Sequence, residues 1–165
     1  MNSFHKLAGR LIEHYRKEKQ QQYGQMFNMK NFCVENGKNI CSFPTYKKLA
    51  NGEFVNNDGF YYRLCMKLDI KYETLDSNNE SFIEDFFTHF NEVCANNSTQ
   101  NKIHFCDYYE PFFKIQKDFL VFRELQACID LLKGINNTAQ ETYLNALESV
   151  VDHPNFVSSL KSLRN

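Results

Sequence analysis

The sequence predicts an all-α protein, and three observations support this class. Apolar residues recur at spacings of three and four along most of the 165 residues, which is the period of an amphipathic helix. Residues that cap and stop helices stand at the ends of these segments. The chain has only six glycines, which argues against a glycine-rich nucleotide-binding α/β fold.

The first predicted helix covers residues 4–19. Its apolar face comprises Phe4, Leu7, Ala8, Leu11, Ile12 and Tyr15. Its charged face comprises Lys6, Arg10, Glu13, Arg16 and Lys17. The polar run at residues 20–22, together with Gly24, should loosen or end this helix. Asn28 is a suitable N-cap for a second, short helix, which Gly37 should close.

Ser42 is the N-cap of a third predicted helix, and Pro44 is tolerated because it falls in the first turn. Asn51 and Gly52 supply a left-handed stop. A fourth helix over residues 58–68 would bury one of two rings and three further side chains: Phe60 or Tyr61, Leu64, Cys65 and Leu68. No strand-like alternation of useful length interrupts this half of the chain.

The second half begins after a polar hinge at residues 75–80 and is also predicted to be helical. Helices are expected over residues 82–94 and 103–113, with a loop at residues 95–101 between them. Pro111 either kinks the second of these helices or begins a new one.

Three more helices follow. The segment 119–132 is apolar nearly all round, which is typical of a central buried helix and also of a dimer interface, and Gly134 ends it. Residues 138–141 (TAQE) fit a capping box that opens the next helix, and Pro154 starts the last one. These helices are expected to form either a bundle or tetratricopeptide-like hairpins, although no clean repeat appears.

Charge divides the chain into two parts. Residues 1–75 hold 12 Lys and Arg against 7 Asp and Glu, whereas residues 76–165 hold 7 against 13. A basic part joined to an acidic part indicates two domains with different partners, the first of which suits a polyanion. We therefore expect an N-terminal domain over residues 1–75 and a second domain over residues 80–165.

No apolar run approaches the ~20 residues needed to cross a bilayer, and the N-terminus lacks the pattern of a signal peptide. The cysteines form no C-x-x-C pair and stand in apolar contexts, at Cys33, Cys41, Cys65, Cys94, Cys106 and Cys128. We expect reduced, buried thiols in a cytoplasmic protein, rather than a disulfide framework or a zinc site.

The segment "ICSFPTYKKLANGE" (40–53) lies between "NMKNFCVEN" and "YYRLCMKLDI" and resembles the core of a Cro/CI-type (XRE) helix-turn-helix domain. That family's recognition helix reads small-apolar, Ser, two variable residues, Thr, apolar, polar, basic, apolar, acidic, Asn, Gly. Residues 41–52 match in order, with Ala50 replacing the acidic residue. The "ICS" start is similar to that of Rgg/PlcR-like regulators, which follow this domain with a helical, tetratricopeptide-like sensor domain.

The resemblance covers residues 5–75 and implies binding to double-stranded DNA. A helix fits the major groove, and cations and N–H groups contact the phosphates beside it. Thr45 would meet a base edge or a thymine methyl, and Lys47 and Lys48 a guanine edge or phosphates. The candidate DNA-binding residues are Asn28, Lys30, Ser42, Phe43, Thr45, Lys47, Lys48 and Asn51.

Some positions depart from the family. Met29, Phe43 and Pro44 stand where glutamine or arginine is frequent, and none of them makes a bidentate base contact. Two loops, at residues 20–27 and 35–39, are longer than the family's norm. Two interpretations follow: a DNA-binding domain with weak direct readout, or a non-DNA-binding adaptor or antagonist that uses the same shape for protein contacts.

An enzyme is not expected, and neither a metal site nor a cofactor is predicted. The five histidines are scattered, and neither H-E-x-x-H nor a phosphate-cradling glycine loop occurs. His104 stands near Cys106 and Asp107 but has no partner at metal-ligand spacing, which favours a surface or core role.

The sequence therefore predicts a cytoplasmic transcriptional regulator that binds DNA. A homodimer is expected, because helix-turn-helix proteins usually pair to read two half-sites ~34 Å apart. The second domain would serve dimerisation, peptide sensing or both. The expected partners are double-stranded DNA, a second copy and a small peptide effector, and no membrane.

Overall fold

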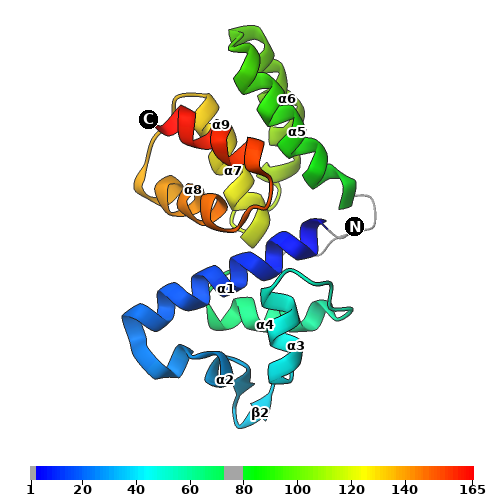
Figure 1. Ribbon diagram of the computed structural model, residues 1–165, viewed down its shortest axis with the longest axis vertical. Helices are drawn as coiled ribbons and strands as arrows, with labels where there is room; N and C mark the ends of the chain where they lie inside the picture. Colours follow the sequence, from blue (N-terminus) through cyan, green and yellow to red (C-terminus); the bar gives the residue numbers. More distant parts are fainter. Residues whose placement is uncertain (1–2, 73–79) are drawn as a thin grey trace. The chain divides into compact units, whose positions relative to one another are not determined.

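The computed structural model describes residues 3–72 and 80–165, and it confirms the all-α class (Figure 1). Within these residues lie nine α-helices, one 3-10 helix and one two-stranded hairpin. The N-terminal elements are α1 (Ser3–Tyr23), η1 (Gly24–Phe27), α2 (Met29–Phe32), β1 (Val34–Glu35), β2 (Lys38–Asn39), α3 (Phe43–Ala50) and α4 (Asp58–Lys67). The C-terminal ones are α5 (Glu80–Asn96), α6 (Thr99–Lys114), α7 (Leu120–Leu132), α8 (Thr138–Val150) and α9 (Pro154–Arg164).

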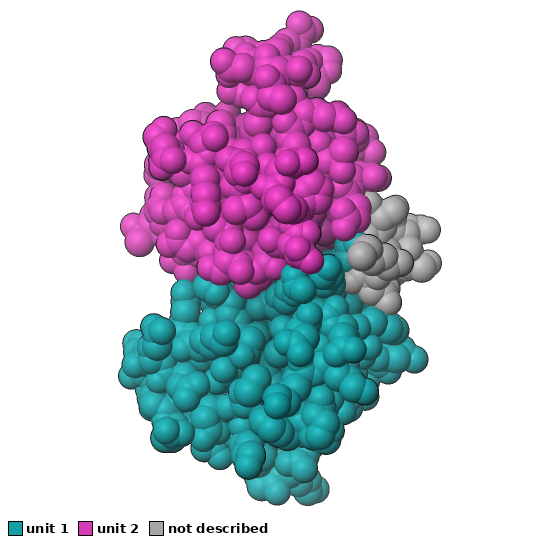
Figure 2. All heavy atoms as spheres, in the orientation of Figure 1, with its two compact units in different colours: residues 1–75, 119–121 teal, residues 76–118, 122–165 magenta. Residues whose placement is uncertain are grey.

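The chain forms two compact units (Figure 2). Unit 1 comprises residues 1–75 and 119–121, and unit 2 comprises residues 76–118 and 122–165. The predicted hinge at 75–80 lies almost wholly outside the described residues. The sequence did not indicate that residues 119–121 return to unit 1, where the Leu120 N–H donates to the Lys71 carbonyl at 2.9 Å.

Helix α1 packs across α3 and α4 (Figure 1). Its predicted apolar face is buried as expected. The helix also continues through Gln20–Gln22, contrary to the prediction, because glutamine is a good helix former. It gives way to η1 at Gly24, whose φ of 77° is left-handed. Gly9 allows the close approach to α3, since a Cβ there would lie 2.1 Å from the Leu49 carbonyl oxygen.

A hairpin replaces the predicted long loop between α2 and α3, at the lower edge of unit 1 in Figure 1. Strands β1 and β2 pair antiparallel, and Asn36 and Gly37 take φ values of 53° and 76° in the connecting turn. Gly37 therefore turns the hairpin and does not close α2, which ends earlier at Phe32. The Ile40 N–H donates to the Cys33 carbonyl at 2.7 Å and extends the pairing.

The predicted caps around α3 are confirmed. Ser42 caps its N-terminus, Pro44 lies in the first turn, and Gly52 stops it with a φ of 90°. In α4 the buried ring is that of Tyr61, whereas Phe60 is half-buried.

In unit 2, α5 packs against α6 and α9, and α8 packs against α9. The first and last helices of the unit therefore touch, which favours the bundle over an open array of hairpins. The predicted loop at 95–101 is much shorter, since Ser98 already caps α6. Helix α6 continues through Pro111, and no new helix begins there.

The capping box of α8 departs from prediction by one residue. The capping box pairs Asn137 with Gln140, rather than Thr138 with Glu141, because Thr138 is the first helical residue. Gly134 takes a φ of 77° after α7, as expected for a stop. All six cysteines lie in the described residues and are free, five of them buried and Cys94 half-buried.

Candidate nucleic-acid interface

Two hydroxyl side chains, those of Ser42 and Thr45, lie at the N-terminus of α3. The Ser42 Oγ accepts the Thr45 N–H at 3.2 Å, and the Ser42 hydroxyl donates to Thr45 Oγ1 at 2.8 Å. Ser42 therefore uses its hydrogen within the cap, whereas the Thr45 hydroxyl hydrogen stays available for an outside acceptor. A phosphate or a base edge is such an acceptor.

Two lysines meet on one aromatic ring. The Lys30 Nζ of α2 lies 5.8 Å from the centre of the Phe43 ring, and the Lys47 Nζ of α3 lies 5.2 Å from it. Both lysines are exposed and Phe43 is half-buried. Cation–π attraction of this kind contributes about 0.5–1 kcal/mol at exposed sites. The ring thus gathers two ammonium groups from different helices beside the start of α3, and their N–H groups remain able to bind an anion.

The other predicted residues are placed differently. Asn28 is the N-cap of α2, where its Oδ1 accepts the Asn31 N–H at 2.8 Å and its Nδ2 donates to Gln25 at 2.9 Å. Asn51 is the C-cap of α3, at the opposite end from Ser42, and its carbonyl accepts from Arg10 at 3.3 Å. Lys48 is exposed on α3. Lys30, Phe43 and Lys47 are therefore brought together, and Ser42 with Thr45, whereas Asn28 and Asn51 act as caps.

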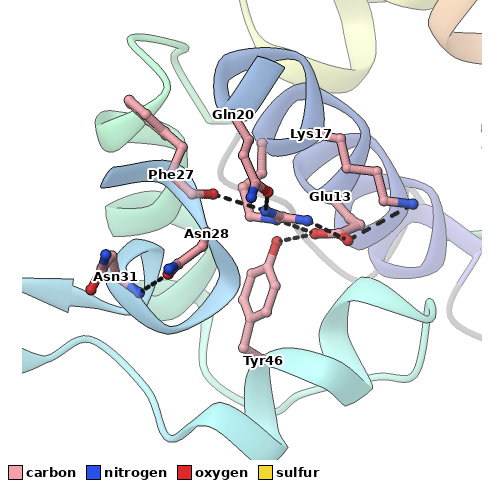
Figure 3. Close-up of polar contacts among 8 residues, drawn as sticks. Glu13, Lys17, Gln20, Phe27, Asn28, Asn31 and Tyr46 are labelled. Carbon is pink, nitrogen blue, oxygen red and sulfur yellow. Dashed lines mark hydrogen bonds and ion pairs between the residues drawn. The ribbon is translucent and has the colours of Figure 1, made fainter. Parts of the chain in front are cut away.

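A buried polar network holds α3 from behind (Figure 3). The Arg16 guanidinium of α1 pairs with both oxygens of the Glu13 carboxylate, at 2.6 and 3.0 Å. The Tyr46 hydroxyl of α3 donates to the same carboxylate at 2.8 Å. Arg16 also donates to the Gln20 side chain at 2.6 Å and to the Phe27 carbonyl at 2.8 Å. One guanidinium thus connects α1, η1 and, through Glu13, the middle of α3.

Arg16 corrects the sequence analysis, which placed it with Glu13 on the charged outer face. It is only 4% exposed. Arg16 follows Ile12 by four residues and therefore continues the apolar stripe, and Glu13 three residues before it is its partner. A charged pair of this spacing at the edge of the stripe is the sequence signal for the network.

The protonation states of this network follow from its contacts. The hydrogen bond that Arg16 donates to Glu13 raises the pKa of Arg16, and burial opposes this only in part. Burial, together with the Glu13 charge, raises the pKa of the Tyr46 phenol. Arg16 is therefore a cation and Tyr46 a neutral donor at neutral pH, which is the pairing that the Glu13 carboxylate requires.

Lys67 of α4 was not singled out by its sequence context. Its Nζ donates to three carbonyls at the end of α2 and the start of β1, those of Asn31, Phe32 and Val34, at 2.9, 3.0 and 2.7 Å. Burial lowers the pKa of this amine. Through these three carbonyls, Lys67 fixes α2 and the hairpin to α4.

The cysteines at the base of the hairpin also contact each other. A hydrogen bond between the two thiols raises the pKa of Cys33 and lowers that of Cys41. Both thiols are buried, which accounts for the apolar residues that surround them in the sequence.

The chain matches no protein-family model, no curated protein and no solved structure. Among the helices of residues 3–72 and 80–165, none is both long and apolar enough to span a membrane. In the same part of the chain, no group of three or more His, Cys, Asp or Glu side chains is arranged to hold a metal ion.

Proposed function

We propose that the chain is a sequence-specific DNA-binding transcriptional regulator, in which the start of α3 enters the major groove. The observation that carries the proposal is the cluster of Lys30 and Lys47 on the Phe43 ring, beside the capped N-terminus of α3. An eight-residue helix with exposed cations at its side suits a groove bordered by phosphates.

Under this proposal, each residue of the cluster supplies a share of the binding energy. Lys30 and Lys47 supply charge for phosphates, the Thr45 hydroxyl supplies one donor, and the Phe43 ring suits a thymine methyl. None of these side chains makes a bidentate base contact, so phosphate contacts dominate the affinity. Binding is then strongly dependent on salt, because each neutralised phosphate releases counterions.

Fluorescence anisotropy with a labelled duplex from the protein's own upstream region tests this at several salt concentrations. Replacing Lys30 and Lys47 by alanine should weaken binding and flatten the salt slope by roughly one unit for each lost phosphate contact. Lys161→Ala on α9 is the matched control, since it removes the same charge from an exposed position in unit 2. Equal effects of all three substitutions, or no binding by folded wild-type protein, would contradict the proposal.

A second candidate, a protein-binding adaptor or antagonist, is favoured by another surface of unit 1. On α4, Tyr62 and Met66 are 53% and 57% exposed and lie one turn apart. They border a hollow of about 410 Å³ that Ile70 and Phe119 also line. Apolar surface of this kind suits a protein partner. Under this alternative, Met66→Lys abolishes binding of the protein partner, whereas Lys47→Ala leaves that binding intact. DNA binding predicts the reverse order of effects.

A further inference from the structure

One face of α6 carries a row of large side chains that unit 2 leaves open. Tyr108, Phe112 and Ile115 are 60%, 46% and 85% exposed. Their spacing of four and three places them on one helical face, and exposed His104, one turn earlier, extends the row. We name these four residues the α6 stripe. Ile103 is also exposed, at 54%, but it lies five positions from Tyr108 and therefore on a different face.

Two rings of the α6 stripe are held in place by neighbouring aromatic side chains. The Phe112 ring packs on Phe82 of α5, with ring centres 4.7 Å apart, and Tyr108 packs edge-on against Tyr109 at 4.8 Å. Beside the stripe, His104 and Tyr108 line a hollow of about 390 Å³ together with Val93 and other residues of α5. A row of projecting side chains next to a recess is a surface against which the side chains of a facing helix can pack.

The helix that the sequence suggested for a dimer interface is already occupied. In α7 the side chains of Leu125, Cys128 and Ile129 are 0% exposed, so its apolar character is explained by the core of its own chain. Apart from Ile103, the other large apolar side chain exposed in the described part of unit 2 is Ile135, at 45%, which lies outside every helix. Within the described part of unit 2, the α6 stripe is therefore the helical apolar face left for a partner.

The charges beside the stripe suit a second copy of α6. Asp107 and Lys114 are exposed on the same flank, seven residues apart, and the Lys114 side chain is 67% exposed although it also lies 3.4 Å from Glu110. If two copies cross antiparallel with a two-fold axis between residues 110 and 111, Asp107 of each copy meets Lys114 of the other. Tyr108 then lies one residue, about 1.5 Å along the helix axis, from the level of Phe112 of the other copy, and symmetry makes each contact twice. Opposite charges along an apolar seam select both the partner and its orientation.

We propose that two copies of this chain pair through the α6 stripe in an antiparallel, isologous interface. The proposal deepens the DNA-binding function and rests on it for its role, because a dimer presents two α3 helices to two half-sites. The pairing itself is measurable without DNA.

Sedimentation equilibrium of the full chain over a concentration series tests the interface. The wild type should show a monomer–dimer equilibrium, and Tyr108→Lys should raise the dimer dissociation constant at least about tenfold by placing a charge in the apolar seam. Ile135→Lys, an equivalent change at an exposed apolar residue outside α6, should leave the constant unchanged. Circular dichroism verifies that both variants keep the helical content of the wild type. A wild type that stays monomeric, or equal effects of the two variants, overturns the proposal and leaves the stripe to another partner.

A charge exchange tests the orientation. Asp107→Lys places lysine opposite Lys114 at two symmetric contacts and should weaken the dimer by about tenfold. Adding Lys114→Asp should restore most of the affinity, because both contacts are again between opposite charges. A double variant as weak as the single one overturns the antiparallel arrangement. Anisotropy with duplex is a separate readout: a dimer that binds no DNA would remove the proposed function and leave this interface standing.

Discussion

The two units hold their helices together by different means. In unit 1, buried polar groups join the elements: Arg16 and Glu13 connect α1 to α3, and Lys67 connects α4 to the hairpin. In unit 2, aromatic rings make up most of the centre, although the Glu124 carboxylate is also buried there and pairs with Arg123 at 3.1 Å. The Phe86 ring alone packs against five others: Phe87, Phe90, Phe105, Tyr109 and Phe113.

The difference bears on what each unit is suited to do. Hydrogen bonds are directional, so a carboxylate that accepts from both Arg16 and Tyr46 admits one orientation of α3 against α1. Ring packing contributes more burial energy but tolerates small shifts. Unit 1 therefore fixes the orientation of α3 through directional contacts, whereas unit 2 gains most of its stability from ring packing.

The largest effect is expected from breaking the aromatic centre of unit 2. Phe86→Ala should lower the free energy of unfolding by about 4 kcal/mol, because it removes a fully buried ring and leaves a cavity. Amide hydrogen exchange, read separately for each unit, should show the loss of protection in unit 2. Ile135→Ala, a truncation at a residue 45% exposed, is the control and should change stability by no more than about 0.5 kcal/mol. Equal losses in both variants would contradict a core role for the cluster.

The next largest effect concerns the polar network of unit 1. Arg16→Met should lower the free energy of unfolding by about 3 kcal/mol, because the Glu13 carboxylate is left buried without its cation. The adjacent Lys17 is the matched control: its side chain is 66% exposed and lies 4.0 Å from the same carboxylate. Lys17→Met should leave unfolding by urea almost unchanged. If both variants were equally stable, the network would contribute little, and the contrast between the units would disappear.

Local features were well predicted from the sequence. Ser42 caps α3, and Gly52 and Gly134 stop helices, because each depends only on neighbouring backbone. Helical periodicity likewise identified the buried face of α1. It misplaced Arg16, however, because hydropathy marks a charged residue as exposed, whatever partner the fold supplies. The capping box at Asn137 was missed by one residue because adjacent Asn and Thr are both acceptable caps.

Features that depend on distant residues were not predictable. Lys67 lies more than 30 positions from the carbonyls it binds. Lys30 and Lys47 were both candidates, but nothing in their spacing showed that they meet on Phe43. The sequence thus named these residues as candidates, and the structure supplied their grouping and the support behind α3.

A smaller effect is expected from a single hydrogen bond of the network. Tyr46→Phe removes the donor to Glu13 but leaves both Arg16 contacts in place, so it should cost about 1 kcal/mol of unfolding free energy. The measurement is urea unfolding at neutral pH. Tyr62→Phe, the same change on a ring 53% exposed, is the control and should have no measurable effect. A loss as large as that of Arg16→Met would show that the phenol, and not the ion pair, organises the network.

The smallest effect concerns the periphery of unit 2, where polar contacts do occur. The Glu110 carboxylate accepts from Lys133 at 2.7 and 2.6 Å and from Gln126 at 3.0 Å. Burial alone would raise the pKa of Glu110, but these hydrogen bonds and the charges of Lys133 and Lys114 lower it overall. Folded protein then binds this proton less readily than unfolded protein, whose Glu pKa is 4.5. The stability that Glu110 contributes is therefore fully present above that pH and is lost as the pH falls through the lower folded value.

Glu110→Gln removes this dependence. The variant should be less stable than the wild type by less than about 1 kcal/mol at neutral pH, because Lys133 is partly exposed to solvent, and the gap should close on acidification. Urea unfolding of both proteins from about pH 6 to about pH 3 measures the gap. A gap independent of pH would mean that the charge of Glu110 does not contribute to stability. In that case, the stability of unit 2 would come from its rings and from its other polar contacts, such as the buried Glu124 with Arg123.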